Sequence, residues 1–203
     1  SGTVGDQLDW DVSNAGDVDG DGIDELLIGA PTSDNNGVSQ AGKAYLFLGT
    51  SLENSATIDL FDADYTFVGE AGDFAGFSVS SAGDVDGDGL DDILIGAPSE
   101  ESVGSSSGKA YLILGSSLAN SIDTIINLSD ADYIFTGENN NDEAGRFVSG
   151  VGDINADGLA EIFIGAPKYD GNGNNVGKAY VISGASLSDD SPSINLSNAD
   201  YQF

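Results

Sequence analysis

Residues 82–98 read AGDVDGDGLDDILIGAP, an acidic, glycine-containing loop that runs directly into a short apolar segment. The same stretch occurs as AGDVDGDGIDELLIGAP at residues 15–31 and as VGDINADGLAEIFIGAP at residues 151–167. The tetrapeptide GKAY follows each copy, at residues 42–45, 108–111 and 177–180. Self-similarity at a period of tens of residues is the signature of a repeat architecture. The chain therefore contains three copies of one structural unit.

Each unit has the pattern of four β-strands. In the middle copy we expect strands at residues 76–83, 92–96, 109–114 and 132–137. The first alternates polar and apolar residues, whereas the second is almost continuously apolar, which indicates burial on both faces. Glycine or proline interrupts every candidate helix, so we expect little helix.

Four short antiparallel strands per unit are typical of a β-propeller blade. The sequence predicts an all-β fold of three such blades, with repeats at residues 1–67, 68–136 and 137–203. A β-sandwich is the alternative, but it does not require units that are this similar to one another.

The composition excludes several classes of function. The chain has 5 basic and 35 acidic residues, so its net charge of −30 opposes binding to nucleic acid or to an anionic membrane surface. Without cysteine or histidine it has no disulfide, no thiolate or imidazole zinc site and no Ser-His-Asp triad. No apolar run approaches the roughly 18 residues that membrane insertion requires.

The acidic loops follow the pattern D-x-[DN]-x-D-G-x-x-[DE], which predicts a metal site in each repeat. The side-chain oxygen donors are Asp17, Asp19, Asp21 and Glu25 in the first loop, Asp84, Asp86, Asp88 and Asp92 in the second, and Asp153, Asn155, Asp157 and Glu161 in the third. Glycine at position six permits the sharp turn, and the next residue can offer its carbonyl oxygen. These carbonyls belong to Ile23, Leu90 and Leu159. Hard oxygen ligands in this number favour Ca²⁺ over Mg²⁺.

The alternative interpretation is that these residues are solvated turns, since aspartate and glycine favour turns. Carboxylates about 5 Å apart repel by roughly 3 kcal/mol per pair at an effective dielectric constant of ~20. Several such pairs rival the roughly 5–15 kcal/mol net stability of a domain, which favours a bound cation. A helical EF-hand is excluded, because position twelve is isoleucine in each loop (Ile28, Ile95 and Ile164). Asn155 replaces an acid, so we expect the third site to bind most weakly.

Together, these motifs resemble the FG-GAP repeats of integrin α-subunit propellers and their bacterial relatives. The resemblance implies one propeller blade per repeat, with calcium in the hairpin between the first and second strands. It also implies an extracellular or cell-surface role in adhesion or binding. The family closes about seven blades into a ring, within the usual range for propellers. We therefore expect the three blades to belong to a longer propeller or to self-associate, a dimer giving six blades.

The partner is expected on the face opposite the calcium loops. The connections at residues 32–41, 99–107 and 168–176 differ between the repeats, and variable loops on a repeated scaffold are where recognition usually resides. A protein ligand is the first hypothesis and a glycan, as in a lectin-like propeller, is the second. An enzyme is the third, because carboxylate pairs hydrolyse glycosides, but the pairs here are committed to the metal loops. The recurring lysines Lys43, Lys109 and Lys178 are expected to pair with nearby acidic groups.

Overall fold

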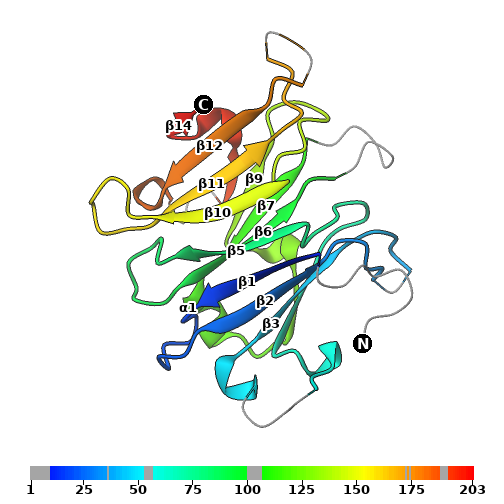
Figure 1. Cartoon of the computed structure of the whole chain (residues 1–203), viewed down its shortest axis with the longest axis vertical. Helices are drawn as coiled ribbons and strands as arrows, with labels where there is room; N and C mark the ends of the chain where they lie inside the picture. The colour runs from blue at the N-terminus through cyan, green and yellow to red at the C-terminus, as the bar shows by residue number, and fades with distance from the viewer. Residues whose placement is uncertain are drawn as a thin grey trace.

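The computed structural model describes residues 10–35, 37–52, 57–99, 107–171, 173, 175–187 and 192–203. Its strands form three twisted sheets that lie side by side, one for each repeat (Figure 1). The sheets do not close into a ring, so the structure is an all-β stack of partial propeller blades, as the sequence predicts.

Each blade has four strands in sequence order, and every strand in this set is antiparallel to its neighbour. The first blade contains β1 (Asp11–Gly16), β2 (Glu25–Ala30), β3 (Lys43–Phe47) and β4 (Tyr65–Val68); the second contains β5 (Ser78–Gly83), β6 (Asp92–Ala97), β7 (Lys109–Ile113) and β9 (Tyr133–Thr136); and the third contains β10 (Phe147–Gly152), β11 (Glu161–Ala166), β12 (Lys178–Ser183) and β14 (Tyr201–Gln202). The middle blade begins and ends each strand within two residues of the predicted position.

In the described residues, helical structure is confined to short turns, as expected from the sequence. These are α1 (Gly115–Asn120) and the 3₁₀ turns η1 (Gly49–Leu52), η2 (Leu60–Asp62), η4 (Leu128–Asp130), η5 (Gly184–Ser186) and η6 (Leu196–Asn198). Within the described ranges, these helices are too short and too polar for any of them to traverse a bilayer.

Two further strands, which the sequence did not reveal, connect successive repeats. β8 (Ile125–Asn127) lies in the second repeat but pairs in parallel with β4 of the first blade. β13 (Ser193–Asn195) likewise leaves the third repeat and pairs with β9 of the second blade. The second and third repeats therefore each add a fifth strand to the outer edge of the blade before them, which protects that edge and fixes the two blades to each other.

The two larger hydrophobic clusters lie between neighbouring blades. Every residue of β6 is buried, because β6 is an interior strand of its sheet and both faces of that sheet are covered. Ile93 and Ile95 belong to the cluster shared with the first blade, whereas Leu94 belongs to the cluster shared with the third. Because successive side chains point to opposite faces of a strand, β6 contributes apolar side chains to the interfaces with both neighbouring blades.

Among the described residues, parts of the outer faces of the stack are exposed, although Tyr45, Phe47 and Leu60 belong to a buried cluster on the outer side of the first blade. Ile154 of the third blade is 60% exposed, although its counterparts Val18 and Val85 are buried under the next blade. At the other end, Val12 of the first blade is 50% exposed, whereas its counterpart Val79 is buried against the blade before it. These faces are the same surfaces that the internal blades use to pack together.

Candidate calcium site

The acidic loops form the hairpins that connect the first and second strands of each blade. We name them hairpin 1 (residues 17–24), hairpin 2 (84–91) and hairpin 3 (153–160). The glycine at position six has a positive φ in all three, at +87° for Gly22, +92° for Gly89 and +96° for Gly158. Residues with a Cβ atom seldom adopt this conformation, which explains why glycine occupies the position.

Backbone amides fix the orientation of the carboxylates. In hairpin 1, Asp17 accepts hydrogen bonds from the backbone N–H groups of Gly20 at 2.8 Å and Gly22 at 3.0 Å. Asp19 Oδ1 accepts from the N–H of Asp21 at 3.0 Å. Each side chain therefore holds the loop through one set of lone pairs and retains others that a cation can use.

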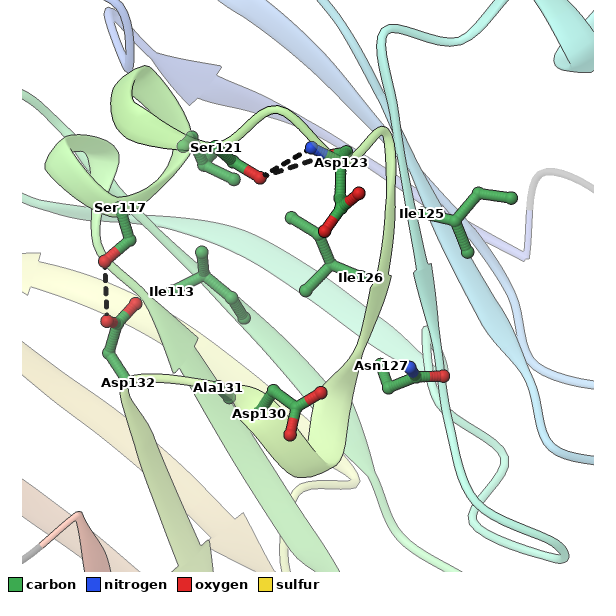
Figure 2. Close-up of a pocket in the computed structure, with 11 residues that line it drawn as sticks. Ile113, Ser117, Ser121, Asp123, Ile125, Ile126, Asn127, Asp130, Ala131 and Asp132 are labelled. Carbon is green, nitrogen blue, oxygen red and sulfur yellow. Dashed lines mark hydrogen bonds between the residues drawn. The ribbon is translucent and has the colours of Figure 1, made fainter.

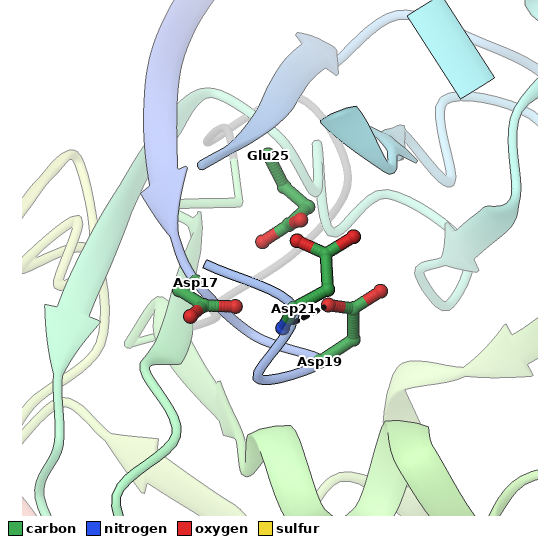
Figure 3. A group of neighbouring side chains, drawn as sticks. All are labelled: Asp17, Asp19, Asp21 and Glu25. Carbon is green, nitrogen blue, oxygen red and sulfur yellow. Dashed lines mark hydrogen bonds between the residues drawn. The ribbon is translucent and has the colours of Figure 1, made fainter. Parts of the chain in front are cut away.

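Hairpin 1 brings its four predicted side-chain ligands together. One oxygen from each of Asp17, Asp19, Asp21 and Glu25 lies within 4.8 Å of the corresponding oxygens of the others. Figure 3 shows the four carboxylates surrounding one space at the start of β2. This arrangement has the oxygen donors that calcium prefers and supplies four of the roughly six to eight ligands that the ion takes.

Glu25 provides the strongest test of whether the site fits a cation. Its side chain is 2% exposed, and its Oε2 accepts a hydrogen bond from the N–H of Val18 at 2.7 Å. Its Oε1 is buried and makes no hydrogen bond of standard geometry within the described part of the chain, although the nearby N–H of Gly49 offsets part of the increase that burial causes in the pKa of this carboxyl. A buried carboxylate oxygen without a partner is costly, so the geometry of hairpin 1 fits a metal ion as the partner of this atom.

Hairpin 2 brings together three of its four side-chain ligands. One oxygen from each of Asp84, Asp86 and Asp88 lies within 4.8 Å of the others, but Asp92 is not part of this convergent group. Asp92 is fully buried, and its two oxygens accept hydrogen bonds from the backbone N–H groups of Val85 at 2.8 Å and Gly115 at 2.9 Å. Aspartate is one methylene shorter than the glutamate of hairpin 1, and both of its oxygens are held by backbone N–H groups.

The pKa values show the cost of gathering these charges. Burial raises the pKa of Glu25, and the charges of Asp19 and Asp17 raise it further. Burial also raises the pKa of Asp92 from its ordinary 3.8 to about 7, with an additional contribution from the neighbouring carboxylates of hairpin 2. A divalent cation would remove this cost, because it favours the ionised form of every carboxylate around it.

Hairpin 3 has a different internal arrangement. The amide nitrogen of Asn155 donates hydrogen bonds to Asp157 Oδ2 and to Glu161 Oε1, both at 2.9 Å. Asp153 accepts from the backbone N–H groups of Asp157 at 3.1 Å and Gly158 at 3.0 Å, and the bond from the glycine at position six is common to all three hairpins. The predicted ligands are therefore adjacent, but an amide group lies among them. The carbonyl ligands predicted at Ile23, Leu90 and Leu159 stay predictions.

The recurring lysines pair with carboxylates that the sequence analysis did not single out. Lys109 Nζ lies 2.7 Å from Glu70, and Tyr111 donates its hydroxyl proton to Asp73 at 2.7 Å. Lys178 forms the equivalent ion pair with Glu138 in the next repeat. The expectation of charge pairing is thus confirmed for two of the lysines. The sequence feature that could have identified Glu70 and Glu138 is the dipeptide GE, which occurs shortly after the DYxF segment at residues 69–70 and 137–138.

A cavity of about 280 Å³ lies beside α1 and β8 (Figure 2). Its carboxylate Asp132 accepts hydrogen bonds from the N–H of Leu114 at 2.8 Å and from the hydroxyl of Ser117 at 2.6 Å. The equivalent carboxylates Asp64 and Asp200 form the same pair of bonds in the other repeats. Asp132 is therefore a structural residue that holds the turn after the third strand.

Comparison with known proteins identifies the repeat. The FG-GAP repeat family model matches residues 10–47, 75–113 and 144–182, which together exceed half of the chain. The chain belongs to the FG-GAP repeat family. Each matched segment spans the first three strands of a blade and contains its acidic hairpin.

Individual relatives agree with this family assignment. The FG-GAP chain is 34% identical to integrin alpha pat-2 of Caenorhabditis elegans over 182 residues, and 30% identical to integrin alpha-PS2 of Drosophila melanogaster over 178 residues. These alignments cover 84% and 85% of the chain. It is also 30% identical to phosphatidylinositol-glycan-specific phospholipase D of Dictyostelium discoideum over 209 residues, which cover 91% of the chain. The chain spans only 11–20% of the length of these three relatives.

Proposed function

We propose that this chain is a calcium-binding β-propeller module of an extracellular or cell-surface protein, and that it acts in adhesion or protein–protein binding. The observation that carries the calcium proposal is the convergence of four carboxylates in hairpin 1 around the unpartnered, buried Oε1 of Glu25. The integrin relatives support the adhesion role, because they share the repeat over most of this chain.

In hairpin 1 the ion would be held by Asp17, Asp19, Asp21 and Glu25, with the carbonyl of Ile23 as a further ligand. In hairpin 2 it would be held by Asp84, Asp86 and Asp88, with Leu90 and Asp92 as further predicted ligands. Bound calcium neutralises charge and fixes the loop, and it takes no part in a reaction.

The hairpins also contact the next blade, which gives calcium a structural consequence. The N–H of Asp91 in the second blade donates to the carbonyl of Asp17 at 2.9 Å, and the N–H of Asp17 donates to Asp91 Oδ2 at 3.0 Å. The N–H of Ala160 in the third blade donates to the carbonyl of Asp84 at 2.9 Å. An ion that orders a hairpin therefore also orders the joint between two blades.

The ligand-binding face is proposed to be the opposite one. Because neighbouring strands are antiparallel, the calcium hairpins and the loops between the second and third strands lie at opposite ends of each sheet. The loops at residues 32–41 and 168–176 are the candidate recognition surface. The third predicted loop, residues 99–107, falls mostly outside the described residues. A protein is the proposed ligand, and binding to a glycan array without binding to protein would favour the lectin alternative.

We also propose that further blades cover the exposed parts of the outer faces of the stack, supplied either by the rest of a longer protein or by a second copy that completes six blades. The exposed side chains of Val12 and Ile154 occupy positions that internal blades cover. A light-scattering mass of twice the chain mass would support the six-blade dimer, and a monomer at micromolar concentration would refute it. The repeat boundaries at residues 67 and 136 stay a prediction that limited proteolysis can test.

The calcium proposal is tested by titration with a matched pair of variants. Glu25→Gln removes the charge of the buried ligand, whereas Asp123→Asn removes the same charge from an exposed residue outside the hairpins. Calorimetric titration should show one fewer tight calcium site in Glu25→Gln and an unchanged number in Asp123→Asn. Equal calcium binding in the two variants would contradict the proposal. Turnover of a phosphatidylinositol-glycan or a polysaccharide by the isolated chain would contradict a purely binding role.

A further inference from the structure

Position three of hairpin 3 is Asn155, where the first two hairpins have aspartate. This replacement does not by itself exclude calcium, because an asparagine carbonyl oxygen is an accepted calcium ligand. Whether hairpin 3 binds an ion therefore depends on which end of the Asn155 amide faces the other carboxylates.

The backbone fixes this orientation. Asn155 Oδ1 accepts a hydrogen bond from the N–H of Asp157 at 2.8 Å, just as Asp19 Oδ1 accepts from the N–H of Asp21 at 3.0 Å. The second terminal atom of this side chain is an oxygen in Asp19 but a nitrogen in Asn155. In hairpin 3 this nitrogen faces the carboxylates, because it donates to Asp157 and Glu161. An amide nitrogen carries two N–H donors and cannot ligate a cation.

A second substitution completes the arrangement. The hydroxyl of Ser183, at the end of β12, donates to Glu161 Oε1 at 3.0 Å, and the N–H of Ile154 donates to Glu161 Oε2 at 2.8 Å. Glu161 is fully buried, and both of its oxygens therefore have partners. The residue equivalent to Ser183 is Leu48 in the first repeat, which offers no side-chain donor there.

The contrast with hairpin 1 is direct. Glu25 is the counterpart of Glu161, and its buried Oε1 receives no side-chain hydrogen bond. In hairpin 3 the same atom receives hydrogen bonds from Asn155 and Ser183. Hairpin 3 also carries two fewer negative charges than hairpin 1, because Asn155 and Ala160 stand where hairpin 1 has Asp19 and Asp24. The repulsion that a cation would relieve is thus smaller, and hydrogen bonds within the protein satisfy the buried carboxylate.

We infer that hairpin 3 is a metal-independent copy, in which the Asn155 amide and the Ser183 hydroxyl take the place of the ion. The chain then binds two calcium ions, in hairpins 1 and 2, and keeps hairpin 3 ordered when calcium is removed. This inference rests on the proposed function. It differs from the expectation from the sequence, in which hairpin 3 is a third and weaker calcium site, because hairpin 3 here binds no calcium.

The test compares calcium stoichiometry, by native mass spectrometry and calorimetry, in the wild-type chain and three variants. Wild type should bind two ions, and Asp157→Asn should still bind two. Glu25→Gln should bind one. The double variant Asn155→Asp/Ser183→Leu, which copies the residues of the first repeat, should bind three.

Three ions in the wild type, or loss of an ion in Asp157→Asn, would overturn the inference while leaving calcium binding intact. No bound ion in the wild type would overturn the proposed function, and the assignment of two filled hairpins with it. The side-chain amide signals of Asn155 in NMR spectra provide a readout that does not depend on a variant that folds. They should keep their positions when calcium is added, and a large shift at saturation would contradict the inference.

Discussion

Removing calcium should lower the melting temperature of this protein by a large and calculable amount. Four carboxylate oxygens within 4.8 Å in hairpin 1 repel by roughly 3 kcal/mol per ionised pair at an effective dielectric constant of ~20. At a concentration of 100 times the dissociation constant, each calcium ion stabilises the folded state by about 2.7 kcal/mol, so two ions contribute about 5 kcal/mol. For a chain of this size about 1 kcal/mol moves the melting temperature by roughly 2–4 °C, which gives a shift of roughly 10–20 °C.

Differential scanning calorimetry at pH 7.5 measures this shift directly, by comparing chelated and calcium-saturated protein. Glu25→Gln should lose about half of the shift, because it removes one of the two sites, whereas the exposed Asp123→Asn should retain all of it. Identical melting temperatures with chelator and with calcium would refute the argument that the hairpin charges require a cation. A full shift in Glu25→Gln would refute the assignment of hairpin 1.

Three further outcomes follow from the structure. The chelated protein should lose up to about 4 kcal/mol of stability as pH rises from about 4 to 7. In this window the raised pKa of Asp92 means that the folded state binds more protons than the unfolded state. Urea unfolding should show this dependence of stability on pH, and calcium should abolish it. Lys109→Met should lower the free energy of unfolding, measured in urea, by about 1–2 kcal/mol, since it leaves the buried carboxylate of Asp73 without its ion pair. An unchanged unfolding midpoint would contradict a structural role for this pair. Leu94→Ala should lower the free energy of unfolding by about 3 kcal/mol in the same assay, because Leu94 is fully buried, and it should leave the number of calcium sites unchanged. Loss of a calcium site would mean that the blade interface and the hairpins are not independent.

The repeats made the blade strands and the acidic hairpins predictable. A continuous apolar run such as DILIGA indicates a strand buried on both faces, and β6 has that burial. The fifth strands were not predictable in this way, because β8 and β13 are only three residues long. They become strands because the outer edge of the preceding blade lies beside them, and a sequence pattern does not contain that information.

The ligand sets were predictable by type but not by arrangement. The spacing of aspartates identified hairpin 1, yet it did not show that Glu25 has an unpartnered buried oxygen or that Asp92 accepts two backbone hydrogen bonds. The interaction of Asn155 with Ser183 joins residues 28 positions apart, which become neighbours only when β11 pairs with β12. Such details depend on tertiary contacts, and local spacing does not encode them.

The most direct measurement is a crystal structure grown in calcium, with anomalous data collected to identify the ion. We predict an anomalous peak between Asp17, Asp19, Asp21 and Glu25, with calcium–oxygen distances of about 2.3–2.6 Å. Only water at that position, in crystals saturated with calcium, would contradict the central claim that these hairpins are metal sites.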